Sequence, residues 1–146
     1  LKSPRRVLLS SSFTAKGKRD SIQDRQENLK FSYEDINFEL IRDLQESTDD
    51  KKIITLRALD KRGKDVTFHP VMGAFAHMVA FDSELNGFAH LHPISEDVPS
   101  SENRTHAGPL SFGFTAPKYG IYRLWAQVKT TTDKEIFIPF DLEFGT

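Results

Sequence analysis

Short segments in which apolar residues alternate with polar ones fill the chain from residue 31 onward, and they constrain its fold more than any other feature. The last of them, Ile136–Phe144, carries Ile, Ile, Phe, Leu and Phe at every second position. A period of two is that of a β-strand with one buried face. Six further segments alternate in this way or are rich in β-branched and aromatic residues: 36–40, 52–59, 74–82, 88–92, 110–114 and 121–129.

Turn sequences separate these segments at short intervals, and no segment shows a sustained helical period. Asn86-Gly87 is a strong hairpin signal, because both residues tolerate the left-handed backbone of a two-residue turn. Ser47–Asp50, Asp60–Gly63 and Pro117–Gly120 also predict turns, and Tyr119–Tyr122 is typical of a tyrosine corner. Together these features predict an all-β fold, a Greek-key β-sandwich of about seven strands.

The domain organisation follows from a change in composition near residue 30. Residues 1–30 are polar and charged without a period of either kind, which indicates an N-terminal arm or linker. Residues 31–146 hold all the strand segments and form the predicted sandwich domain. Pro139 suggests that the last strand lies at a sheet edge or contains a bulge. The core is expected to contain Phe112, Phe114, Trp125 and the phenylalanines of the last strand.

The composition excludes several classes of function. Twenty basic and 21 acidic residues leave a formal charge of −1, so there is no basic excess for a phosphate backbone and we expect no nucleic-acid partner. The absence of cysteine excludes disulfides, thiolate nucleophiles and metal sites that need a Cys ligand, including the blue-copper centre. No apolar run reaches the roughly 18–20 residues that span a bilayer, so we expect no transmembrane segment.

Residues that can bind a metal ion are concentrated in one part of the chain. Four of the five histidines and both methionines lie between Thr67 and Pro93, and the fifth histidine, His106, follows in the next loop. The 66 residues before this stretch contain neither residue type. The rest of the chain therefore has the character of a scaffold.

His90 and His92 are the most informative pair in this stretch. Residues two apart on a strand point to the same face, about 6.5–7 Å apart along the chain. A hairpin centred near Asn86 pairs residues whose numbers sum to about 170, which places His77 opposite position 92 or 93. Three neutral imidazoles suit Cu(II), Zn(II) or Ni(II). The spacing therefore predicts a metal site made of His77, His90 and His92, with copper as the first choice and zinc as the alternative.

Four other residues are possible additional ligands. A thioether from Met72 or Met78 would favour Cu(I), and His69 and His106 lie in the flanking loops. The alternative interpretation is that the methionines fill gaps in the core and that the two loop histidines have no ligand role.

His77 also has two interpretations. It shares a strand face with Phe75, Val79 and Phe81, which gives that face the character of a core, so a structural, hydrogen-bonded histidine fits as well as a ligand.

Three segments together resemble a cupredoxin-like β-sandwich domain of secreted or periplasmic bacterial proteins. They contain a G-x-x-x-H motif at Gly73–His77, an H-x-H-P motif at His90–Pro93, and a P-x-x-G-x-Y-R-x-W-x-Q strand at Pro117–Gln127. The resemblance covers roughly residues 34–145. It implies a cupredoxin- or immunoglobulin-like sandwich, an extracytoplasmic location, a role in copper or heavy-metal handling, and the ligands His77, His90 and His92. The missing cysteine favours binding, storage or delivery of the ion over electron transfer.

Three hypotheses about function follow. The first is a non-catalytic metal-binding domain whose partners are the ion and another protein of the cell envelope. The second is a structural or interaction module of a larger envelope protein, in which the histidines only form hydrogen bonds. The third is a metal-dependent hydrolase, because three His ligands and an open position can activate water. No obvious general base accompanies the histidines, so we rank the hydrolase last.

Overall fold

A computed structural model describes residues 14, 16–17, 25–42, 51–85, 87–94, 103–130 and 134–144. The described residues form ten strands and no helix, which confirms the predicted all-β class. They accordingly contain no helix that could cross a membrane. The predicted turn at Ser47–Asp50, Asn86 of the predicted hairpin, and most of the predicted arm lie outside the described residues.

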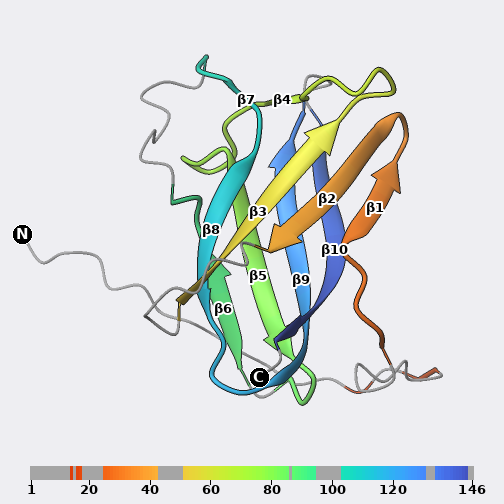
Figure 1. Cartoon of the computed structure of the whole chain (residues 1–146), viewed down its shortest axis with the longest axis vertical. Coiled ribbons are helices and arrows are strands. Elements are labelled where there is room, and N and C mark those ends of the chain that lie inside the picture. The colour runs from red at the N-terminus through yellow and green to blue at the C-terminus, as the bar shows by residue number, and fades with distance from the viewer. Residues whose placement is uncertain are drawn as a thin grey trace, which may run out of the picture.

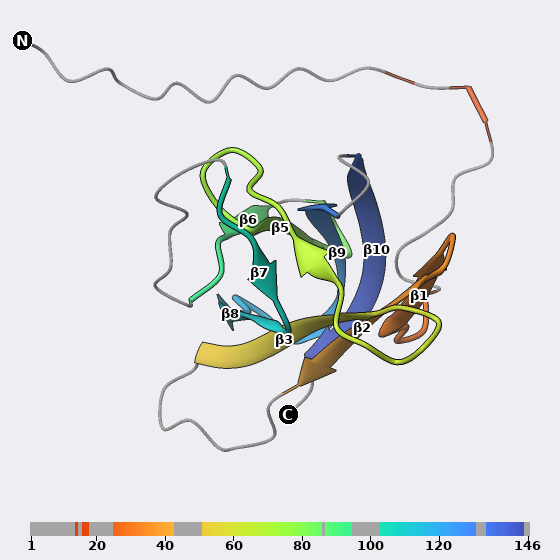
Figure 2. The ribbon, with the colours of Figure 1, turned by 90° about the horizontal axis from the view of Figure 1, so that it is seen from above.

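Two four-stranded antiparallel sheets pack against each other (Figures 1 and 2). The front sheet has the order β1 (Lys30–Tyr33), β2 (Ile36–Arg42), β3 (Lys51–Leu59) and β8 (Leu110–Thr115). The back sheet has the order β10 (Glu135–Phe144), β9 (Gly120–Lys129), β5 (Ala76–Asp82) and β6 (Phe88–Leu91). A short pair, β4 (Thr67–Phe68) and β7 (His106–Ala107), lies at one end.

The chain crosses between the sheets in the manner of a Greek key. The neighbours β3 and β8, and likewise β5 and β9, are not consecutive in the sequence. Ten strands are present instead of about seven because β1, β4 and β7 are only two to four residues long. Strands this short carry too little alternation to stand out in a sequence. The strand with Pro139, β10, lies at the edge of the back sheet, as predicted.

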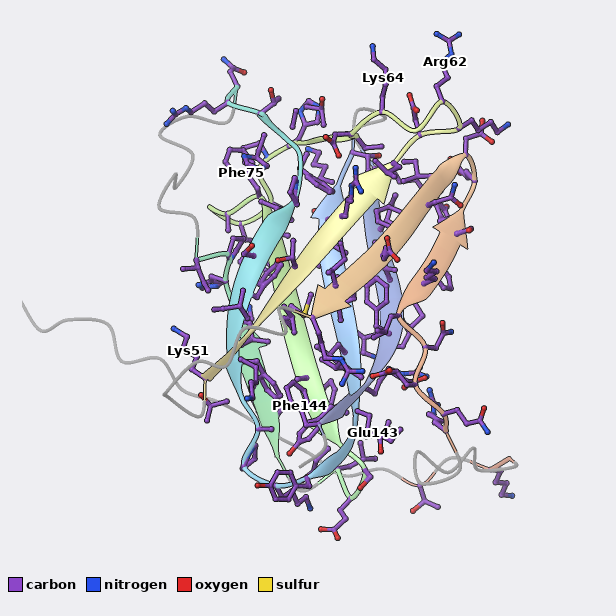
Figure 3. All side chains as sticks on the ribbon, viewed as in Figure 1. Lys51, Arg62, Lys64, Phe75, Glu143 and Phe144 are labelled. Atoms are coloured by element: carbon purple, nitrogen blue, oxygen red, sulfur yellow. The ribbon has the colours of Figure 1, made fainter. Side chains whose placement is uncertain are left out.

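The core lies between the two sheets, and β5 contributes its small-residue face to it. Ala76 and Met78 are 0% exposed and Ala80 is 2% exposed. Opposite them on β9 stand Val128, Ala126 and Leu124. In each pair an alanine lies beside a larger residue on the same inner face of the sheet. Charged side chains such as Arg62 and Lys64 instead point away from the sandwich (Figure 3).

Three expectations about the core are wrong. Val79 and Phe81 lie on the outer face of the back sheet with His77, and not in the core. Trp125 also points outward and is 37% exposed, because Leu124 and Ala126 on either side of it occupy the inner face of β9. Phe112 and Phe114 are buried, as predicted, whereas one phenylalanine of the last strand, Phe137, is exposed.

The predicted tyrosine corner is present at Tyr122. Its hydroxyl donates a hydrogen bond to the carbonyl oxygen of Lys118 at 2.9 Å, and the side chain is buried. The Nζ atom of Lys118 reaches Glu84 at 2.7 Å and Asp82 at 3.2 Å. The hydrogen bond to Glu84, assisted by Asp82, raises the pKa of Lys118. These contacts join the tyrosine corner to the end of β5 and to the connection that follows it.

Replacing Tyr122 with phenylalanine is expected to lower the free energy of unfolding by about 1 kcal/mol, because the Lys118 carbonyl loses its buried donor. Urea unfolding with an unchanged m-value would measure this loss. Tyr119→Phe is the matched control, because Tyr119 lies in the same corner but is 75% exposed. Equal stabilities for the two variants would contradict a structural role for the hydroxyl of Tyr122.

Residues just before β1 run along the sandwich edge and contact both sheets. Asn28 forms two backbone hydrogen bonds with Asp141 of β10, at 2.8 and 2.9 Å. The carbonyl oxygen of Leu29 then accepts a hydrogen bond from the backbone N–H of Leu40 in β2 at 2.8 Å. The division of the chain at residue 30 into an arm and a domain stays a prediction.

Candidate metal centre

The register of the β5–β6 hairpin brings the three predicted ligands together. Val79 pairs with His90 and Met78 with Leu91, which is one residue from the register that the sequence predicted. The same register continued by one position places His77 opposite His92. Because side chains alternate between faces, all three imidazoles stand on the outer face of the back sheet.

The three rings form a compact cluster. The ring centroid of His92 lies 4.8 Å from those of both His77 and His90. One nitrogen from each ring belongs to a set whose members all lie within 4.8 Å of one another. His77 Nδ1 and His90 Nε2 are 3.1 Å apart. Two nitrogens on one tetrahedral ion, each about 2.0–2.1 Å from it, would be separated by roughly 3.3 Å. The cluster therefore needs only small side-chain rotations to share an ion.

A backbone hydrogen bond orients the ring of His77 within the cluster. His77 Nε2 lies 2.8 Å from the carbonyl oxygen of Val71. A carbonyl oxygen only accepts hydrogen bonds, so Nε2 carries the proton and donates it. In the neutral ring Nδ1 then has a lone pair, and it faces His90 Nε2. A histidine whose second nitrogen is held by a backbone carbonyl is the usual arrangement of a metal ligand. In the metal-free protein, His90 Nε2–H donates to His77 Nδ1.

A tight turn covers His77 from outside. Val71 and Ala74 exchange two backbone hydrogen bonds of 2.8 and 3.2 Å, and Met72 and Gly73 between them both have positive φ angles, 46° and 80°. The loop before β5 lies beside the start of β5, on the side of the back sheet that faces away from the front sheet (Figure 2). This cover explains why His77 is only 5% exposed on an outer sheet face, whereas His90 and His92 are exposed.

The other four proposed ligands are not members of this group of three rings. Met78 is fully buried on the core side of β5, opposite to His77. The ring of His106 packs against Phe75 with centroids 5.5 Å apart, and its Nε2 donates to the carbonyl of Pro109 at 3.2 Å. The backbone of His69 pairs with Lys129 at the end of β9. Met72 lies on the covering turn and is 72% exposed.

Among the His, Cys, Asp and Glu side chains, the cluster consists of imidazoles alone. In the part of the chain that the structure describes, one group of three or more potential ligand side chains could hold an ion, and it contains these three histidines and no carboxylate. Beside it on the outer face, Gln127 stands opposite His77 and Trp125 opposite Val79. This set could hold an ion, and the described residues place no carboxylate in it that could act as a base toward water.

Sequence reasoning missed the role of Val71 and of the turn that follows it. Val71 supplies a backbone atom, which no side-chain motif reveals. The signal that could have revealed the turn is Met72-Gly73 between apolar residues, since a glycine at the second position of a two-residue connection favours a tight hairpin.

Fold and site together define a Greek-key β-sandwich with a three-histidine cluster on one outer face that could hold a metal ion. The chain belongs to the family described as a domain of unknown function, DUF8832, whose model matches residues 31–145. That range contains all five histidines and nearly the whole sandwich. No curated protein and no solved structure matches the chain.

Proposed function

We propose that this chain is a non-catalytic, extracytoplasmic metal-binding domain that binds or delivers copper through His77, His90 and His92. One observation carries the proposal: the hydrogen bond from His77 Nε2 to the Val71 carbonyl directs Nδ1 toward His90 Nε2, 3.1 Å away. A buried histidine oriented in this way, beside two exposed ones, is a fixed ligand with two accessible partners.

The chemistry of the ligand set supports copper as the first choice and zinc as the alternative. Sites made of nitrogen ligands bind Cu(II) more tightly than Zn(II) when both ions are available. The exposure of His90 and His92 suits an ion that is loaded and released, and another protein of the cell envelope is the expected donor or acceptor. The extracytoplasmic location and the link to copper rest on the resemblance of the Gly73–His77 and His90–Pro93 motifs to cupredoxin-like domains.

The alternative function is that of a structural or interaction module. The buried His77–Val71 hydrogen bond favours it, because that bond fastens the covering turn to β5 whether or not an ion is present. The two functions differ in what they predict for added metal, since a structural module binds no ion at micromolar concentration.

The test is a calorimetric titration of chelator-treated protein with Cu(II), Cu(I) and Zn(II). The metal content is checked by mass spectrometry. We expect one equivalent to bind. Because Val79 stands between Trp125 and His90, the only tryptophan lies about two strand spacings, or roughly 10 Å, from the cluster, and Cu(II) should quench its fluorescence.

The double variant His90→Ala/His92→Ala is expected to lose this binding while the melting temperature of the metal-free protein changes by less than about 3 °C, because both side chains are exposed. His69→Ala, which removes a histidine outside the cluster, is the matched control and should bind like the wild type. Binding that survives in the double variant would show that the site is misassigned, and no binding by the wild type would favour the structural module.

A further inference from the structure

Met72 occupies a backbone position that does not suit a methionine. It is the first residue of the two-residue turn between Val71 and Ala74, with a φ of 46°, and Gly73 follows with a φ of 80°. A turn with two left-handed residues strongly prefers Asn, Asp or Gly at its first position. For a residue with a longer side chain, this conformation brings Cβ close to the following carbonyl and is strained.

Burial does not compensate for this strain. Met72 is 72% exposed, whereas Met78, the only other methionine, is 0% exposed. A methionine in a protein interior fills space, but an exposed one gains little from its apolar surface. Neither backbone preference nor packing therefore accounts for a methionine at this position.

The position is attached directly to the histidine cluster. The carbonyl group immediately before Met72 accepts the hydrogen bond from His77 Nε2 at 2.8 Å. The turn lies beside the start of β5, on the side of the back sheet that faces away from the front sheet (Figure 2). Since the chain contains no cysteine and Met78 is buried on the opposite side of β5, Met72 is the one exposed residue of the chain that has a soft donor atom.

We propose that Met72 supplies a thioether ligand to an ion held by the histidine cluster and makes the site selective for Cu(I). This inference rests on the proposed function, because it requires that the cluster binds metal. Imidazoles alone accept Cu(II), Zn(II) and Ni(II), whereas a thioether selects Cu(I). The strain at Met72 is then the cost of placing sulfur beside the histidines, and the cargo is the cuprous ion.

Met72→Asn is the decisive variant, because asparagine suits the backbone and removes the sulfur. We expect its melting temperature to equal or exceed that of the wild type. Its affinity for Cu(I), measured by competition with a chromogenic Cu(I) chelator, should fall by about tenfold or more, and its affinity for Zn(II) should change by less than about threefold. The X-ray absorption spectrum of the Cu(I) form should show a sulfur neighbour in the wild type and none in the variant.

Met78→Leu is the matched control, because it removes the other thioether from the core side of the same strand and should leave Cu(I) affinity unchanged. The inference is overturned if Met72→Asn binds Cu(I) as tightly as the wild type, or if the wild-type spectrum lacks a sulfur neighbour. These results would leave the histidine site intact. A wild type that binds neither Cu(I) nor Zn(II) would instead refute the proposed function, and this inference with it.

Discussion

Replacing His77 with alanine is expected to abolish metal binding and also to destabilise the metal-free protein by about 2–4 kcal/mol. His77 is only 5% exposed, and its imidazole fills the space beneath the turn that begins at Val71. The substitution leaves a cavity there and removes the donor that the Val71 carbonyl uses. The same change removes Nδ1 of His77, the candidate ligand nitrogen whose ring the Val71 carbonyl holds in place.

Urea unfolding of chelator-treated protein measures the loss of stability, and the metal titration measures the loss of the site. His92→Ala should also weaken metal binding but cost less than about 1 kcal/mol of stability, because His92 is exposed. If His77→Ala unfolds at the wild-type urea concentration, the hydrogen bond to Val71 does not stabilise the fold. If it binds the ion with wild-type affinity, the ion lies elsewhere.

A second variant separates the two roles of His77. The amide nitrogen of glutamine can occupy roughly the place of Nε2 and donate to the Val71 carbonyl, but glutamine has no counterpart of Nδ1. We therefore expect His77→Gln to recover part of the stability that alanine loses and none of the metal affinity. Recovery of both would mean that His77 Nδ1 is not a ligand.

Replacing Asp141 with alanine is expected to cost about 3 kcal/mol of stability. Asp141 is 6% exposed on β10 and accepts two hydrogen bonds of 2.7 Å from Nε and Nη2 of Arg123 on β9. Arg25, in the segment before β1, approaches the same carboxylate at 3.7 Å. Without Asp141, the largely buried guanidinium of Arg123 would lose its counterion but remain shielded from water. An uncompensated buried charge of this kind strongly lowers the free energy of unfolding.

The control for Asp141 is an aspartate in a closer but exposed pair. Asp35 lies 2.6 Å from Lys61, but their side chains are 70% and 71% exposed. Water screens this pair, so Asp35→Ala should change stability by less than about 0.5 kcal/mol. Equal losses for the two variants would contradict the assignment of Asp141 to a buried network. Metal affinity should be unchanged in Asp141→Ala, because Arg123 stands opposite Phe81, away from the histidines.

Much of the candidate site could be predicted because it depends on local sequence. His90 and His92 share a face since side chains on a strand alternate, and the hairpin turn sets which residues of β5 stand opposite them. Both rules act over a few residues, so the cluster with His77 could be derived before any tertiary contact was known. The tyrosine corner at Tyr122 is local in the same sense, because its partner is only four residues away.

The orientation of β5 and β9 toward the core could not be predicted in the same way. Each strand has two apolar faces, and either could be buried. On β5, Val79 and Phe81 lie on one face and Met78 on the other. On β9, Trp125 lies on one face and Leu124 on the other. The larger aromatic residues suggested the wrong face. In the structure, alanines on one strand face larger residues on the other, and this fit depends on a pair of strands that are far apart in the sequence.

By itself, then, the sequence determined the strand segments, the Greek-key class and the placement of His77, His90 and His92 on one face, because alternation and turn chemistry act between near neighbours. Only the tertiary structure decided that this face is the outer one, and that a turn folds back to bury His77 and fasten its Nε2 to the Val71 carbonyl. It also placed Met72 in a left-handed backbone conformation, directly after the Val71 carbonyl that bonds to His77. These features arise from the packing of two sheets and from a backbone hydrogen bond, and neither leaves a pattern in the order of side chains.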